Sequence, residues 1–122
     1  MENYIVSIFI KKGHEDDVVR FYQNLEPKLK EAPGYRGREI FLAKPGTMVA
    51  AVKKIYTAEE LAKHAEPPHE DPGVQLIVIE HWDSVDERMT FSKTLDSSRQ
   101  REIIPHLMPN HSHEFFEDRS VT

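Results

Sequence analysis

The apolar segment from Val74 to Trp82 constrains the fold more than any other part of the sequence. It reads VQLIVIEHW and ends in the chain's only tryptophan. Asp83 and Ser84 follow, and Glu87 lies three residues beyond Ser84, which is the spacing of a helix capping box. This pattern predicts a buried strand that runs directly into a capped helix. Trp82 at the junction is expected either to seal the core or to form one wall of a small-molecule pocket.

A strand–helix–strand unit is predicted in the first third of the chain. Residues 4–11 read YIVSIFIK, and their β-branched and aromatic side chains are typical of a strand that is covered on both faces. Residues 35–43 predict a second strand. Between the two strands, an apolar stripe with four–three–four spacing predicts a helix; the stripe consists of Val18, Tyr22, Leu25 and Leu29. Pro27 is expected to kink or split this helix.

An insertion and a last strand complete the chain. Residues 48–56 predict a further strand, and residues 57–65 predict a short helix that begins with a capping box. Residues 66–73 are rich in proline and predict a loop of the kind that often edges binding sites. Residues 110–117 read NHSHEFFE and predict the last strand. Three of its side chains share one face of that strand: His111, His113 and Phe115.

The order of these elements predicts an α+β fold of the ferredoxin-like type. It corresponds to a βαββαβ protomer with an insertion, about residues 46–73, between the second and third main strands. With 122 residues the chain has the size of a single domain, which we assign to residues 1–122. Helices are expected on one face of the sheet only, which leaves an apolar face bare. We therefore expect a homodimer whose two sheets pack face to face and form a barrel.

Composition excludes several classes of protein. The net charge of −5 provides no basic surplus to neutralise phosphates, so no nucleic-acid partner and no membrane partner is expected. The absence of cysteine rules out disulfides, thiolate nucleophiles and zinc–cysteine sites. The amino-terminal residues lack a signal-peptide pattern, and no segment is long and apolar enough to span a bilayer. A cytoplasmic protein is therefore expected.

Three short stretches carry a resemblance to a known family. They are Phe21-Tyr22, Pro33-Gly34-Tyr35 followed by Gly37, and the junction Glu80-His81-Trp82-Asp83-Ser84. Over nearly the whole chain, the sequence resembles the antibiotic biosynthesis monooxygenase-type domain, one of the dimeric α/β-barrel families. The resemblance implies a dimer whose sheets form a barrel and a pocket between the sheet and the helices of each protomer. Relatives of this type include cofactor-independent monooxygenases of aromatic polyketides, quinol monooxygenases and haem-degrading enzymes.

The chain departs from two branches of this family at residues that their chemistry uses. The haem-degrading branch has a first-strand asparagine, where this chain has Val6 or Ser7, and a haem-ligating histidine on the helix after the tryptophan. No histidine lies between Trp82 and His106, so a haem iron would lack its axial ligand. The polyketide-oxidising branch often has an asparagine four residues before the tryptophan, where this chain has Val78. A glycine-rich phosphate loop is also missing, and we expect no cofactor.

The leading hypothesis is a cofactor-independent monooxygenase that acts on a small aromatic or polyketide-like compound. Trp82 would position the aromatic ring, and a histidine would take the phenolic proton so that the anion reacts with oxygen. His81 is the first candidate for this base and His113 is the second. No metal is assigned to the site. The residues expected to line the ligand pocket are Ser7, Tyr22, Phe41, Val78, Met89 and Phe91.

Two alternatives remain open. The chain would be a non-catalytic, small-ligand-binding or stress-responsive dimeric barrel if the pocket retained its ligand without turnover. It would be a metal-assisted enzyme if His81 met His111 and His113, which requires the last two strands to pair. Histidines at strand edges are, however, more often solvated or paired with carboxylates. His64 and His69, near the proline-rich segment, are expected to be solvated or to belong to a pocket lid.

Overall fold

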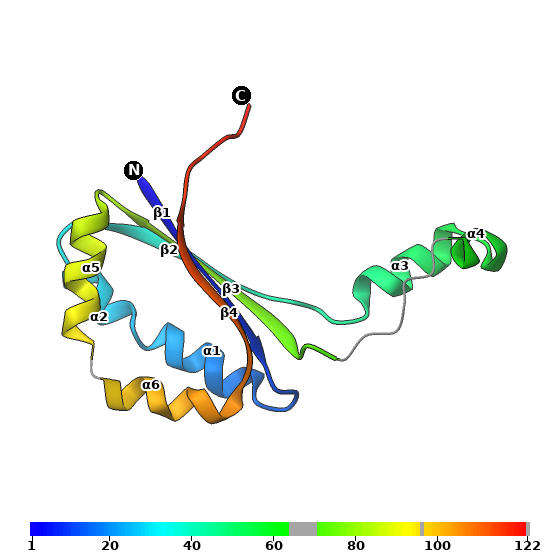
Figure 1. The fold of residues 1–122 in the computed structure, drawn as a ribbon, viewed down its shortest axis with the longest axis horizontal. Coiled ribbons are helices and arrows are strands. Elements are labelled where there is room, and N and C mark those ends of the chain that lie inside the picture. The colour runs from blue at the N-terminus through cyan, green and yellow to red at the C-terminus, as the bar shows by residue number, and fades with distance from the viewer. Residues whose placement is uncertain (64–70, 96, 122) are drawn as a thin grey trace.

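The computed structural model describes residues 1–63, 71–95 and 97–121, and its centre is a four-stranded antiparallel sheet (Figure 1). The strands are β1 (Glu2–Ile10), β2 (Tyr35–Leu42), β3 (Val74–Trp82) and β4 (Leu107–Phe116). They lie in the order β2–β3–β1–β4, so the first strand of the chain separates the last two. This order, with helices after β1 and β3, confirms the predicted ferredoxin-like α+β fold.

Helices cover one face of this sheet (Figure 1). They are α1 (Glu15–Gln23), α2 (Glu26–Glu31), α5 (Val85–Thr94) and α6 (Ser97–Ile103), and the 3₁₀ turn η1 (Ile104–His106) joins α6 to β4. Pro27 lies in the first turn of α2 and separates it from α1, as predicted, because a proline is tolerated only where its missing N–H is not needed. Ser84 caps α5 by accepting a hydrogen bond from the Glu87 backbone N–H at 3.2 Å.

Alternation along the strands places the core between the sheet and this helical layer. Every second residue of β3 is buried, from Val74 to Trp82. Val6, Ile8 and Ile10 of β1 lie beside them, and Val18, Leu29 and Phe91 close the core from the helices. The side chains of the intervening residues point to the opposite face, which we call the outer face of the sheet.

Several apolar side chains on the outer face lack the cover that the sequence predicts for β1. Ile5 pairs with Ile79 there, and both are only half-buried. Phe41 of β2 pairs with Ile77, and 54% of its surface is exposed. In a single copy, the described residues therefore bury the inner face of β1 but leave its outer face only partly covered.

The insertion forms an arm of two helices that projects away from the sheet (Figure 1). Its first part, α3 (Thr47–Ile55), corrects the strand predicted for residues 48–56. A strand needs a neighbour to pair with, whereas a helix at this position satisfies its own backbone hydrogen bonds. The predicted capping box is confirmed, because Thr57 and Glu60 bond reciprocally at the start of α4 (Ala58–Ala62). Residues 64–70, which include most of the predicted proline-rich loop, lie outside the described residues.

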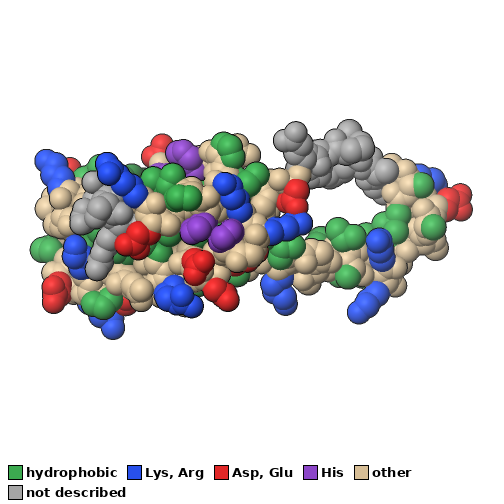
Figure 2. Space-filling model, turned by 90° about the horizontal axis from the view of Figure 1, so that it is seen from below, with side chains coloured by type: hydrophobic (Ala, Val, Ile, Leu, Met, Phe, Trp, Pro, Cys, Tyr) green, Lys and Arg blue, Asp and Glu red, His purple; other side chains and the backbone are tan. Residues whose placement is uncertain are grey.

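Neither helix of the arm buries a residue in the described structure. Met48, Val49, Ile55 and Tyr56 are exposed, and Figure 2 shows hydrophobic side chains along the surface of the arm. The described helices include none with the length and apolar character needed to cross a membrane.

Candidate functional site

A cavity of about 390 Å³ opens between the inner face of the sheet and the helical layer. β1, α1, α5, α6 and β4 all contribute to its wall. Most of the lining is apolar, and it includes Val6, Ile8, Phe21, Leu25, Phe91 and Ile103. A cavity of this size and polarity accommodates a small, mostly apolar molecule.

A buried ion pair forms the most polar part of the wall. The Nε of Arg88, on α5, donates to Oε1 of Glu80, on β3, at 2.7 Å, and the two side chains are 8% and 4% exposed. The indole N–H of Trp82 donates to the same carboxylate oxygen at 2.8 Å. The guanidinium carbon of Arg88 lies 4.2 Å from the centre of the Tyr4 ring, a cation–π distance. These contacts fix a positive charge at the cavity wall.

His113 faces the same cavity from β4. Its Nδ1 lies 3.3 Å from the phenolic oxygen of Tyr4, and its ring centre lies 5.6 Å from that of His111. Burial lowers the pKa of His113, and electrostatic interactions with His111 and Arg88 lower it further, whereas Glu80 acts in the opposite direction. The imidazole is therefore held in its neutral form, in which one ring nitrogen accepts a proton.

Two phenols complete the polar lining. Burial raises the pKa of Tyr22 to about 12, and burial also raises the pKa of Tyr4. Both hydroxyls therefore remain protonated near neutral pH. The neutral His113 tautomer that donates from Nδ1 to the Tyr4 oxygen leaves Nε2 free to accept a proton. The lining thus combines an imidazole of lowered pKa, two protonated phenols and the guanidinium of the Glu80–Arg88 pair, groups that can accept a proton from a ligand and donate hydrogen bonds to the anion.

The structure brings three of the predicted site residues to this cavity: Tyr22, Phe91 and His113. Trp82 is fully buried behind the wall, where its ring packs edge-on against Tyr35 and near Phe91. Of the two roles considered for the indole, it therefore takes that of a core plug. It reaches the cavity only through its hydrogen bond to Glu80.

Three other predicted residues lie away from the cavity. Ser7, Phe41 and His81 lie on the outer face of the sheet. Each is adjacent in its strand to a residue that faces inward, and successive side chains of a strand point to opposite faces. His81 bonds Asn3 at 2.9 Å and Glu39 at 2.8 Å there. Ser7 accepts from the Gln75 side chain at 3.0 Å.

The remaining two of the predicted pocket residues also do not line the cavity. Met89 is 50% exposed on α5, whereas Val78 is fully buried in the core.

The metal site of strand histidines, considered as an alternative, does not form. β1 lies between β3 and β4, so the last two strands do not pair, and His81 is on the opposite face from His111 and His113. His64 and His69 lie outside the described residues. Among the residues that are described, the group whose ligand atoms converge is His14, Asp17 and His106, on the surface of the helical layer.

Sequence reasoning missed Tyr4, Glu80 and Arg88 as site residues. A signal for Glu80 was available, since it takes an inward position between Val78 and Trp82, where a charged group needs a buried partner. The identity of that partner was not available, because Arg88 belongs to a helix whose rotation about its axis depends on how it packs.

No protein-family model and no curated protein matches the chain, but solved structures share its fold. An antibiotic biosynthesis monooxygenase crystal structure matches with a TM-score of 0.61 at 16% identity, over 98% of this chain and 100% of that one. A variant of SnoaB, a cofactor-independent oxygenase from Streptomyces nogalater, matches with a TM-score of 0.57 at 9% identity, over 98% and 95%. Hydroxynitrile lyase from Passiflora edulis matches with a TM-score of 0.59 at 14% identity, over 99% and 96%.

These likenesses establish the fold of the chain. The antibiotic biosynthesis monooxygenase-like domain predicted from the sequence is confirmed at this level. Since the same fold serves proteins described as an oxygenase and as a lyase, the reaction must be argued from the side chains of the cavity.

Proposed function

We propose that this chain, with its antibiotic biosynthesis monooxygenase-like fold, is a cofactor-independent monooxygenase that acts on a small aromatic or polyketide-like compound. One observation carries the proposal: a histidine whose pKa is lowered by burial and a fixed guanidinium face the same apolar cavity. An electron-rich phenol or enol fits this environment, because its ring contacts the apolar wall while its hydroxyl meets the base.

The proposed reaction begins with His113 as the general base. It takes the proton from the substrate hydroxyl, and the guanidinium of Arg88 stabilises the resulting oxyanion. The anion gives one electron to molecular oxygen, and the substrate radical then combines with superoxide to form a peroxide on a ring carbon. His113 returns its proton to this peroxide, and the O–O bond then breaks as the hydrogen on the same ring carbon leaves with the outer oxygen as water. This leaves a quinone, so one oxygen atom enters the product and the other leaves as water. The substrate supplies all the electrons, so the step requires no other reductant.

The comparisons and the cavity chemistry support this proposal over a purely binding barrel. SnoaB, which is described as a cofactor-independent oxygenase, shares the fold of this chain. A barrel that only retains a ligand does not need a neutral base beside a fixed cation. Trp82 takes the role of a positioning residue in the proposed enzyme, since its indole N–H holds the carboxylate that holds Arg88.

We expect His113→Ala to lower kcat/KM for oxygen consumption about 100-fold, because the variant lacks the general base. The measurement is oxygen uptake with a dihydroxynaphthalene substrate and no added cofactor. His81→Ala is the matched control, since His81 lies on the outer face, and it is expected to retain the wild-type rate. Equal rates for His113→Ala and the wild type would refute the assignment of the base, and absence of oxygen uptake would refute the monooxygenase.

The pH profile provides a readout that separates a base from a structural residue. Because the pKa of His113 is lowered, the acid limb of kcat/KM should lie below the ordinary histidine value of about 6.5. His111→Ala removes one cause of the lowering, so the limb should move toward higher pH. A limb that stays in place in this variant would contradict the role of His113.

We also propose that a second copy of the chain covers the outer face of the sheet. Ile5, Ile77 and Ile79 are half-buried and Phe41 is exposed there, and they are neighbours in the sheet; contiguous exposed apolar groups of this kind often mark an interface. Beyond β2, the arm exposes further apolar side chains, namely Met48, Val49 and Ile55, and we propose that the partner covers these as well.

We expect Ile77→Asp to weaken the dimer about 100-fold, since it would bury an unpaired carboxylate between the two sheets. Sedimentation equilibrium over the micromolar range would measure the change. The control is Val85→Asp, which places the same charge on an exposed valine at the start of α5. A wild-type chain that is monomeric at these concentrations, or equal association of the two variants, would contradict the proposed dimer.

A further inference from the structure

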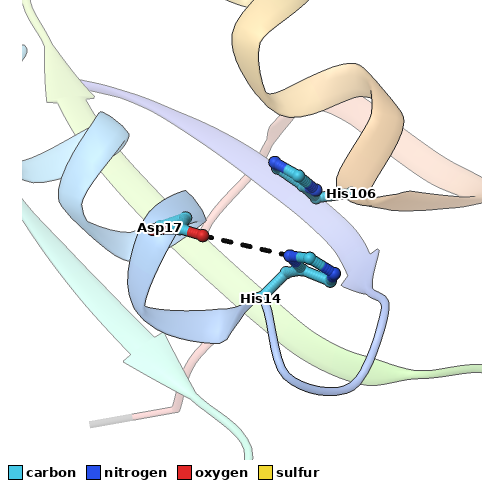
Figure 3. Close-up of side chains that lie close together, drawn as sticks. All are labelled: His14, Asp17 and His106. Atoms are coloured by element: carbon cyan, nitrogen blue, oxygen red, sulfur yellow. Dashed lines mark ion pairs between the residues drawn. The ribbon is translucent and has the colours of Figure 1, made fainter.

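Two imidazoles and a carboxylate converge at the surface of the helical layer (Figure 3). One ligand atom from each of His14, Asp17 and His106 lies within 4.8 Å of the other two. Nδ1 of His14 is 3.9 Å from Oδ2 of Asp17. The two imidazole rings are stacked, with centres 4.2 Å apart and planes 12° from parallel. Figure 2, which looks onto the helical layer, shows histidine side chains beside acidic ones at this surface.

The backbone holds the two histidines in place, although they are far apart in the sequence. The N–H of Lys11 donates to the carbonyl of His106 at 2.8 Å, and the N–H of His14 donates to the carbonyl of Lys11 at 3.1 Å. The ammonium of Lys11 also bonds the carbonyl of Pro105 at 2.9 Å. Asp17 lies one turn into α1, on the side of the helix that faces His14. The positions of all three side chains therefore follow from the pairing of β1 with β4.

The neighbouring charges leave the carboxylate available. Arg20 forms an ion pair with Asp17, but its Nη1 is 3.8 Å from Oδ1, which is longer than a hydrogen bond. Glu15 uses both of its oxygens on the N–H of Gly13. The pair of His14 and Asp17 is itself long, at 3.9 Å, so no strong contact within the cluster has to be broken for a ligand to enter.

We propose that His14, Asp17 and His106 bind a divalent transition-metal ion, with Zn²⁺ as the best fit. Two imidazole nitrogens and one carboxylate oxygen are ligands that Zn²⁺ prefers, and water would fill the fourth position. Zinc–ligand bonds of about 2.0–2.2 Å need ligand atoms about 3.3 Å apart, and each imidazole binds zinc in the plane of its ring. The two rings would therefore have to turn out of their stacked arrangement so that one nitrogen of each points at the ion. The ion would tie the start of α1 to η1. Since Ile104 and Leu107 on either side of His106 line the cavity, it would also brace that wall.

The first test is a titration of the untagged, chelator-treated protein with ZnCl₂, followed by calorimetry and by NMR of the imidazole nitrogens. We expect one ion per chain, shifts confined to the imidazoles of His14 and His106, and a higher melting temperature when zinc is in excess. MgCl₂ should produce none of these effects, because Mg²⁺ prefers an all-oxygen site. A dissociation constant weaker than about 1 mM, or shifts at other histidines, would overturn the proposal.

Matched variants test each ligand separately. His14→Ala and His106→Ala should each weaken zinc binding at least tenfold, whereas His111→Ala should not. Asp17→Asn should also weaken it, while Asp16→Asn removes the same charge from the adjacent residue and should have a smaller effect. Equal zinc affinity in the wild type and the double variant His14→Ala/His106→Ala would place the ion elsewhere and refute this site. None of these measurements depends on the proposed oxygenase activity.

Discussion

Replacing Glu80 with alanine is expected to destabilise the folded protein by about 3–5 kcal/mol. The variant removes one partner of a buried ion pair and leaves the guanidinium of Arg88 without its carboxylate, which is a large cost at a site that excludes water. It also leaves the indole N–H of Trp82 without its acceptor. Urea denaturation followed by far-UV circular dichroism would measure the change in the free energy of unfolding.

Asp83→Ala is the matched control for this variant. Asp83 also binds an arginine, since Arg36 donates to it through two nitrogens at 2.8 Å, but that pair is exposed to solvent. Exposed pairs contribute little, so the urea midpoint should hardly change. If Glu80→Ala were no less stable than Asp83→Ala, the buried network described above would not exist in solution.

A double variant separates the pair from the rest of the network. Glu80→Gln/Arg88→Met removes both charges while keeping most of the volume of the two side chains. It should be more stable than Glu80→Ala, because an uncompensated buried charge costs more than the loss of the whole pair. Lower stability of the double variant would mean that the pair itself, rather than charge compensation, stabilises the fold.

The scaffold could be predicted from the sequence because its signals are local. The apolar run ending at Trp82 and the Ser84/Glu87 spacing predicted both the strand and the start of the following helix, and both are observed. The split at Pro27 follows from the chemistry of one residue. Each of these features depends on side chains within a few positions of one another, so no knowledge of tertiary contacts was needed.

The arm shows where local signals are insufficient. Residues 48–56 contain β-branched side chains, which favour a strand, but also alanines and lysines, which favour a helix. The outcome depended on whether another strand lay beside the segment. It projects beyond the sheet, where backbone groups pair only within a helix.

The site was the hardest part to predict because its side chains come from separate elements. Tyr4 and His113 are 109 residues apart and meet only because β1 pairs with β4. His81 and Glu80 are adjacent, yet alternation places them on opposite faces of the sheet, so an error of one position exchanges a cavity residue for an outer-face residue. His81 was predicted as the base because of the chemistry of its side chain. The alternation of β3, however, places Glu80 and not His81 on the inner face, where the cavity lies.

Trp82→Ala is expected to destabilise the protein by about 3–5 kcal/mol, since it empties the volume of the largest fully buried side chain. The indole fills the space between β3 and the helices and packs near Tyr35 and Phe91, so its removal leaves a cavity that these rings cannot fill. The control is Tyr56→Ala, which removes a half-exposed ring from the end of α3 and should change the free energy of unfolding by less than about 1 kcal/mol.

Trp82→Phe separates packing from hydrogen bonding at the same position. It keeps an aromatic ring in the core but lacks the N–H that donates to Glu80, so the loss should be about 1–3 kcal/mol, smaller than for Trp82→Ala. Because the indole reaches the cavity only through Glu80 and Arg88, Trp82→Phe should also lower kcat/KM for oxygen consumption less than His113→Ala does. A loss of activity as large as that of His113→Ala, in a protein of near wild-type stability, would instead place the indole in contact with the substrate.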